Sequence, residues 1–198
     1  LTFVAPEADL TPSASAAQRD AGEMLLAPYC REIVGESAPE RTMAGRVGQT
    51  LFNSLPDMAL RLESPAMHAH LSRLLNDRAY DILQVEGIEM APYALELMAK
   101  LSPGRRPFLV FDDHNAEYLL QKRAFQTDLR RPRRWLGAAY SWVQWQKLVR
   151  YERRICEMAD RVVAVSEADG LALRRLSPEL DVTVVPNGVD LEFLRPGV

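Results

Sequence analysis

Residues 160–166, Asp-Arg-Val-Val-Ala-Val-Ser, and residues 182–190, Val-Thr-Val-Val-Pro-Asn-Gly-Val-Asp, decide the fold of this chain. Each is a short β-branched run that stops at a polar turn, as a buried parallel strand does where it meets a loop. Residues 80–87 and 108–118 repeat this layout. Strands and helices in this alternation predict an α/β fold with a Rossmann-like, doubly wound parallel sheet, whose ligands bind beyond the carboxyl ends of the strands.

The periodicity of apolar residues along the chain predicts the individual elements. We expect strands at residues 1–4, 30–35, 81–85, 107–112, 161–165 and 182–186. We expect helices at residues 14–26, 42–53, 65–77, 88–101, 115–126, 132–158 and 167–176, two of them starting at Ser64-Pro65 and Ser166-Glu167. A chain of 198 residues with 47% apolar residues has enough material for one good core, so one domain is expected.

The composition of the chain argues against some classes of function. The net charge of −3 argues against a nucleic-acid partner. No apolar run approaches the roughly 18 residues that a membrane-spanning helix needs. Cys30 and Cys156 lie far apart in neither a metal nor a redox spacing, which favours buried thiols in a reducing compartment and predicts a cytoplasmic protein.

Four motifs in order carry a family resemblance: residues 81–85 (Asp-Ile-Leu-Gln-Val), 111–118 (Phe-Asp-Asp-His-Asn-Ala-Glu-Tyr), 151–167 (from Tyr-Glu-Arg-Arg to Val-Ser-Glu) and 185–190 (Val-Pro-Asn-Gly-Val-Asp). Their order and spacing over residues 80–196 resemble the amino-terminal domain of family 4 glycosyltransferases. This resemblance implies one half of a GT-B fold, in which two Rossmann-like domains face a cleft. The first domain contacts mainly the acceptor, and the second mainly the sugar nucleotide.

The resemblance also implies how the chain relates to a whole enzyme. Residues 1–196 correspond to the acceptor-side domain, without its first strand and Gly-rich turn, and residues 197–198 begin a linker. The carboxyl-terminal domain, with its Glu-x7-Glu pattern, is expected to follow Pro196, so the chain is expected to be a fragment that is inactive alone.

The reaction that the resemblance implies is transfer of a hexose from a nucleotide sugar, with retention, to a glycan, lipid-linked or small-molecule acceptor, as in polysaccharide biosynthesis. The nucleotide sugar is a co-substrate held by the absent domain. No cofactor and no metal are expected, because protein donors and helix amides can neutralise the leaving diphosphate.

His114 is the candidate catalytic residue, because an imidazole just after a buried strand can hydrogen-bond a sugar hydroxyl or polarise a leaving phosphate. In similar enzymes a histidine on this loop reaches the transferred sugar. A structural alternative is that His114 orients the next helix, with Asp112 or Asp113 as its N-cap. Glu117 similarly fits a capping box that reaches back to the N–H of His114.

The other candidate substrate contacts follow neighbouring strands: Glu86, Gly87, Asn115, Ser166, Asn187 and Gly188. Ser166 suits either a phosphate at a helix N-terminus or an ordinary N-cap. Asn187 and Gly188 fit an Asn-Gly turn with a positive φ at glycine, and the resemblance places them near the cleft. Asp190 is expected to tether the crossover between the domains.

Residues 122–154 are basic, with ten Lys or Arg against Asp128 and Glu152, and contain all three tryptophans. This pattern fits an anionic membrane at the inner face of the cell, or a phosphate-bearing lipid acceptor. The patch is Arg130, Arg131, Arg133, Arg134 and Trp135. Alternatively, Trp142, Trp145 and Val149 form the core face of a helix whose arginines are solvated.

Parts of the sequence also suggest two other classes of function. Asp112, Asp113 and His114 suggest a metal-dependent hydrolase, but adjacent residues seldom point at one metal, and no second cluster has suitable spacing, since His68 and His70 fall in a predicted surface helix. A non-catalytic module that binds a carbohydrate or a lipid head group is the main alternative, because the chain holds half a cleft. A reading frame that continues into a second Rossmann-like domain would favour the enzyme.

Overall fold

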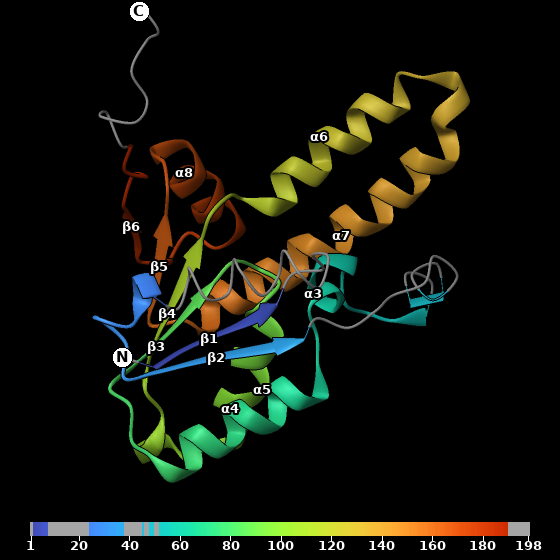
Figure 1. Ribbon diagram of the computed structural model, residues 1–198. Helices are drawn as coiled ribbons and strands as arrows, with labels where there is room; N and C mark the ends of the chain where they lie inside the picture. The colour runs from blue at the N-terminus through green and yellow to red at the C-terminus, as the bar shows by residue number, and fades with distance from the viewer. Residues whose placement is uncertain (1, 8–23, 38–44, 46–47, 50–51, 190–198) are drawn as a thin grey trace, which may run out of the picture.

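A computed structural model describes residues 2–7, 24–37, 45, 48–49 and 52–189 (Figure 1). All six predicted strands are present, each within three residues of the expected bounds. They are β1 (Thr2–Glu7), β2 (Glu32–Ser37), β3 (Ile82–Glu86), β4 (Phe108–Asp113), β5 (Arg161–Ala164) and β6 (Val182–Val184). Strands β3 to β6 form a parallel four-stranded sheet in sequence order, so the predicted α/β fold with a parallel sheet is confirmed.

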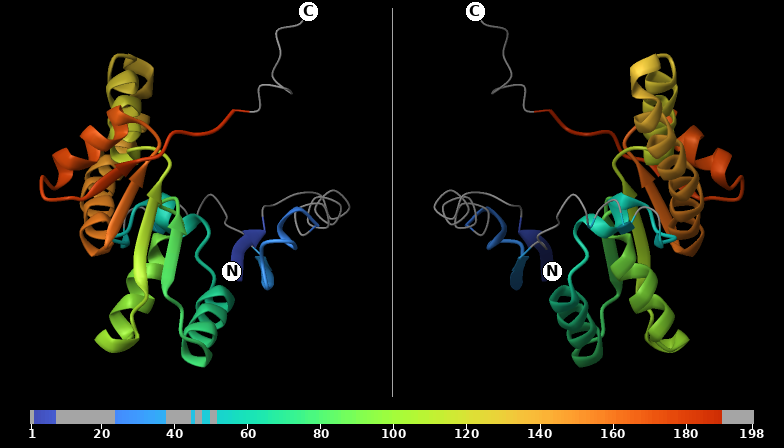
Figure 2. Two further views of the ribbon diagram at one scale, coloured as in Figure 1. Left: turned by 90° about the vertical axis from the view of Figure 1, so that its left-hand side faces the viewer. Right: turned by 90° about the vertical axis from the view of Figure 1, so that its right-hand side faces the viewer.

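The first two strands form a parallel pair of their own. Figure 2 shows this pair standing apart from the four-stranded sheet. Two polar contacts join the two sheets: Arg78 Nη1 lies 2.7 Å from Glu32 Oε2, and the hydroxyls of Thr2 and Tyr80 are 3.3 Å apart. Among the described residues β1 and β2 do not pair with β3 to β6, so the six predicted strands form two parallel sheets.

The helices that cover these strands also follow the predicted order. They are α3 (Asp57–Arg61), α4 (Pro65–Asp77), α5 (Ala91–Lys100), α6 (Glu117–Leu129), α7 (Trp135–Met158) and α8 (Glu167–Leu176), with short 3-10 turns η1 (Pro103–Arg105) and η2 (Pro132–Arg134). Ser64 and Ser166 are N-cap residues, as expected. Helix α3 was missed, since Ser54 and Pro56 suggest a turn there. Most of the helices predicted at 14–26 and 42–53 lies outside the described residues.

One row of buried side chains runs across the four-stranded sheet and forms the centre of the core. Val85, Phe111, Val162 and Val182 are register partners from strand to strand, and none is more than 7% exposed. Burying such side chains contributes about 1.5–3 kcal/mol each. Helices α5, α7 and α8 pack on this core with Leu95, Leu148, Ile155 and Leu173.

Helices α6 and α7 form a hairpin that extends away from the sheet (Figure 1). The rings of Phe125 and Trp145 stack at 6.0 Å between centroids, and Lys122 Nζ lies 5.4 Å from the Trp145 ring. Trp145 and Val149 pack against the core as predicted. Trp142 does not, because it is 47% exposed, and the buried face of α7 runs instead through Ala138, Ser141, Gln144, Leu148 and Tyr151.

Candidate functional site

The carboxyl ends of β3 to β6 meet at one edge of the sheet because the strands are parallel. Two backbone hydrogen bonds extend the ladder just beyond the strands: Gly87 N–H donates to Asp112 O at 2.9 Å, and Val185 N–H to Ala164 O at 2.9 Å. The chain just after β3 is thus held beside the end of β4, and the chain just after β6 beside the end of β5. This arrangement brings the predicted residues Glu86, Gly87 and His114 to one place.

A cavity of about 720 Å³ opens at this edge, enclosed by β1, α4, β3 and α5. Its walls are mainly apolar, with Val4, Leu71, Leu74 and Leu97 among them. Its polar lining at the carboxyl ends of the strands comes from Glu86, Gly87, Glu89 and His114. A mainly apolar hollow with a few convergent polar groups has the character of a small-molecule site.

His114 is exposed directly after the buried strand β4, and Asn115 is exposed beside it. Gly87 has a φ of 77°, which is the left-handed region that favours glycine. A Cβ there would also approach Glu89 Oε2 at 3.3 Å. The backbone conformation and the close approach of Glu89 therefore both favour glycine at this position on the rim of the cavity.

The start of α6, three residues after His114, is fixed by a side chain from α7. Glu152 is fully buried, and its two carboxylate oxygens accept the backbone N–H groups of Glu117 at 2.9 Å and Tyr118 at 2.7 Å. These N–H groups lie in the first turn, where a helix has no internal acceptors. Ala116 is the N-cap residue and provides no side-chain hydrogen bond, so neither Asp112 nor Asp113 is the N-cap.

Asp113 is buried beside Glu152 at the end of β4. Burial raises the pKa of Asp113 well above its ordinary range and raises that of Glu152 to about 7. The nearby charge of Glu152 raises the pKa of Asp113 further, whereas a hydrogen bond with Asp113 lowers the pKa of Glu152. Among the described residues no donor faces the Asp113 oxygens. A protonated Asp113 can instead donate to Glu152, whose carboxylate the two α6 N–H groups favour. The raised pKa values therefore favour a proton shared by the pair, directly before His114 in the chain.

Sequence reasoning missed the role of Glu152. The available signal was its position, because it is the one carboxylate among residues 129–156 and lies on the apolar face defined by Leu148 and Ile155. A lone acid on a buried helix face needs a partner. Its partners lie 34 and 35 residues away in sequence.

The rim of the cavity carries further acidic groups. Burial, followed by the nearby charge of Glu89, raises the pKa of Glu117. Glu89 is paired with Arg61 at 3.4 Å. Together with exposed Glu86, these carboxyls give the rim hydrogen-bond acceptors suited to sugar hydroxyls.

Ser166 is engaged in capping helix α8. Its Oγ accepts the backbone N–H of Asp169 at 3.1 Å and also contacts the Asp169 carboxylate. The other Asp169 oxygen accepts the Ala116 N–H at 3.4 Å, which links the starts of α6 and α8. The N-cap alternative is thus confirmed for Ser166, and a phosphate contact stays a prediction.

Asn187 and Gly188 follow β6 as exposed, extended chain. Gly188 has no positive φ, so the predicted Asn-Gly turn is wrong. Its added Cβ would meet nothing within 4 Å. Contact of these two residues with a substrate stays a prediction, and Asp190 lies outside the described residues.

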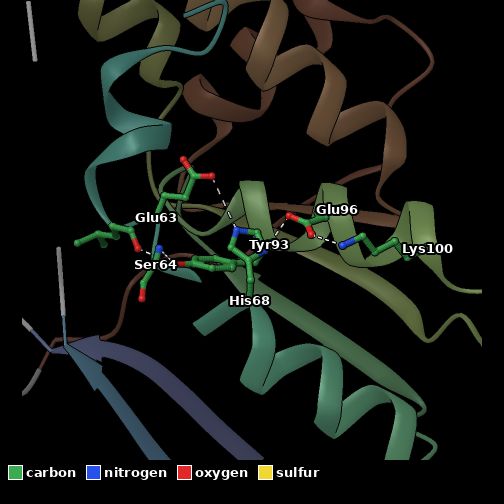
Figure 3. A network of polar contacts seen from close by, with 7 residues as sticks. Glu63, Ser64, His68, Tyr93, Glu96 and Lys100 are labelled. Atoms are coloured by element: carbon green, nitrogen blue, oxygen red, sulfur yellow. Dashed lines mark hydrogen bonds and ion pairs between the residues drawn. The ribbon is translucent and has the colours of Figure 1, made fainter. Parts of the chain in front are cut away.

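One wall of the cavity is held by a polar network between α4 and α5 (Figure 3). Tyr93, which lines the cavity, donates its hydroxyl to Leu62 O at 2.6 Å and accepts from Ser64 N–H at 2.8 Å. The His68 ring lies 4.4 Å from the Tyr93 ring, with Nδ1 at 2.8 Å from Glu96 Oε2 and Nε2 at 3.9 Å from Glu63. His68 is thus a packed structural residue.

Predictions made for residues outside the cavity rim have mixed outcomes. The patch residues Arg130, Arg131, Arg133, Arg134 and Trp135 are exposed where α6 meets α7, away from the elements that enclose the cavity (Figure 1).

Cys156 is buried and Cys30 half-buried, and both are free. Within the described ranges, no group of three or more His, Cys, Asp or Glu residues is arranged to hold a metal ion. No helix in that part of the chain is long and apolar enough to cross a bilayer.

The parallel sheet, with helices between its strands and a cavity at its carboxyl ends, defines a Rossmann-like α/β domain. The profile of Glycosyltransferase Family 4 matches residues 28–193, and the chain belongs to this family. Comparison with curated protein sequences gives no match.

A similar solved structure is a sucrose-phosphate synthase from Thermosynechococcus elongatus, with a TM-score of 0.51 and 16% identity. The superposition covers 99% of this chain and 47% of the synthase, so this chain spans about half the length of that protein. At this identity the likeness concerns the fold.

Proposed function

We propose that this chain is the acceptor-side domain of a glycosyltransferase that moves a hexose from a nucleotide sugar to a glycan, lipid-linked or small-molecule acceptor, with retention. The observation that carries the proposal is the position of His114. It is exposed after β4 and lines the cavity together with Glu86 and Gly87. Membership of Glycosyltransferase Family 4 supports the reaction class.

The arrangement of the site suggests a chemical role for each of its residues. The imidazole of His114 donates a hydrogen bond to a sugar hydroxyl or to the leaving phosphate. The carboxyls of Glu86 and Glu89 accept from the hydroxyls of the acceptor. Glu152 and Asp113 act through the backbone, because they fix the first turn of α6 and hence the loop that carries His114.

The donor is expected to be held mainly by a second Rossmann-like domain outside this chain. Without it, developing charge on the leaving diphosphate has few protein donors opposite it, so this chain alone is expected to have little transferase activity. The nucleotide sugar serves as a co-substrate, and neither a cofactor nor a metal is part of the proposal.

The test is to assay the full-length protein against a panel of UDP-, GDP- and ADP-sugars and to follow the anomeric configuration of the product by NMR. Turnover of at least one donor, with the anomeric configuration kept, supports the proposal. Product of inverted configuration would contradict retention. Full activity of residues 1–198 alone would contradict the division between the two domains.

A non-catalytic module that binds a carbohydrate or a lipid head group is the second candidate. The mainly apolar wall of the cavity beside a short polar rim favours it. Glycan binding by the full-length protein, without turnover or binding of any sugar nucleotide, is the result that would establish this alternative.

We further propose that the enzyme works in the cytoplasm at the inner face of an anionic membrane. A lipid-linked acceptor would be presented there. The basic patch at the junction of α6 and α7 is the part of the chain that supports this location.

A further inference from the structure

We propose that the tip of the α6–α7 hairpin, residues 129–136, docks on the surface of an anionic phospholipid bilayer. Three large apolar side chains of this hairpin tip are open to solvent: Leu129 is 64% exposed, Trp135 68% and Leu136 66%. An isolated exposed leucine is ordinary on a protein surface, but three large exposed apolar side chains within eight residues at the tip of one hairpin are a more unusual concentration. This inference does not depend on the reaction proposed above.

The charge of the hairpin tip complements an anionic surface. It carries Arg130, Arg131, Arg133 and Arg134, all exposed. The nearby acid, Asp128, is paired with Arg134 at 2.9 Å. No ion pair in the described part of the chain engages the other three arginines. Each basic residue near an anionic membrane contributes about 1 kcal/mol, so the arginines together suffice for measurable binding.

The hairpin presents this tip in a suitable way. Both helices extend away from the sheet, so the tip can meet a flat surface without the rest of the domain intervening (Figures 1 and 2). Stacking of Phe125 on Trp145, with Lys122 over the same ring, holds the two helices together behind the tip. Further along α7, Tyr140 and Trp142 are 40% and 47% exposed, as amphipathic rings at a membrane interface are.

A bilayer explains both properties of the tip, whereas a nucleic acid explains one. Phosphate contacts to DNA or RNA would use the arginines but would leave Leu129 and Leu136 in water. At a lipid surface, arginines contact head groups while leucine and tryptophan enter the acyl boundary.

Co-sedimentation of the full-length protein with vesicles tests the proposal. One set of vesicles is phosphatidylcholine alone, and the other has phosphatidylglycerol in place of part of it, each at low and high salt. We expect binding to the anionic vesicles that weakens with salt. The pair Arg130→Glu and Arg131→Glu should reduce the binding constant at least about tenfold, and Trp135→Ser with Leu136→Ser should also reduce it.

The matched control is Arg150→Glu with Arg154→Glu, an equal charge change at exposed positions on the same helix α7 but away from the tip. It should leave most of the binding intact. Three results would overturn the proposal: no binding to anionic vesicles, equal loss with the control pair, or heparin binding that needs the arginines while the Trp135 and Leu136 changes affect neither ligand. Sugar-nucleotide turnover without vesicles should be unchanged in the tip variants, so failure here leaves the proposed reaction standing.

Discussion

The carboxyls of Asp113 and Glu152 lie together beneath the loop that carries His114. Their pKa values are raised because burial disfavours the charged forms. Glu152 nevertheless accepts two backbone N–H groups, so its carboxylate is needed where it lies. A proton shared between the two carboxyls reduces the buried charge and still leaves Glu152 able to accept the two N–H groups. The loop of the candidate catalytic histidine is thus positioned by a pair of acids that need not touch the substrate.

This pair makes stability depend on pH. The folded state binds protons more tightly than the unfolded chain, so the free energy of unfolding falls as pH rises from about 4.5 to about 7. Because the two carboxyls titrate together, this loss belongs to the pair and is on the order of a few kcal/mol. Asp113→Asn removes one titrating group and keeps a donor toward Glu152. We expect the variant to be more stable than the wild type above pH 7, with a shallower pH slope, in urea unfolding across this range.

Asp112→Asn is the control, because it makes the same change at the neighbouring, half-buried position. It should not flatten the slope. Wild-type stability that rises between these pH values, or an Asp113→Asn variant with the wild-type slope, would show that the pair is ionised in the folded protein.

Ser166 allows a structural role and a binding role to be separated. Ser166→Ala removes the N-cap of α8 and should lower the free energy of unfolding by about 1 kcal/mol. Ser166→Asn restores a capping oxygen but not the hydroxyl. If both variants keep the wild-type KM for the donor in the full-length protein, Ser166 is a cap and nothing more. An increased KM in the Asn variant, despite restored stability by thermal unfolding, would establish contact with the substrate.

Among the elements, strands were predictable and helix faces were less so. Buried parallel strands such as β4 and β5 are short apolar runs between polar turns, rich in aromatic and aliphatic residues in β4 and in valine in β5, and few other structures share that pattern. The spacing of Trp142, Trp145 and Val149 also fits a helix face, but α7 is rotated so that Trp142 is exposed. Only Trp145 and Val149 of the three pack against the core, beside the buried Gln144 and Leu148. Periodicity locates a helix, whereas its partners decide which stripe is covered.

The rotation of α7 predicts different costs for two tryptophans. Trp145→Ala loses the stack on Phe125, the Lys122 contact and core packing, and should cost about 2–3 kcal/mol, less than a fully buried tryptophan. Trp142→Ala should cost less than about 1 kcal/mol, since its side chain is 47% exposed. Urea unfolding of the two variants gives the comparison, and equal costs would mean that α7 packs through the face expected from sequence.

For the whole molecule, the sequence predicted the fold class, the positions of the strands along the chain and the edge of the sheet at which Glu86, Gly87 and His114 lie. It could not predict the separation of β1 and β2 from the main sheet, because that depends on pairing between edges and not on either strand's own pattern. Nor could it identify the partners of Glu152, since the lone carboxylate on an apolar helix face indicates that a partner exists but not that it lies 35 residues away. Both features that the sequence did not predict depend on contacts between segments that lie far apart in the sequence.

The measurement that bears most directly on the central claim is donor turnover by full-length His114→Ala, with His70→Ala as the matched change on helix α4. If His114 acts at the reaction centre, its loss should lower kcat/KM at least about tenfold, or about 1.4 kcal/mol of transition-state stabilisation, while the His70 variant stays near wild type. Wild-type turnover by the His114 variant would contradict the account and leave His114 as a surface residue of the loop.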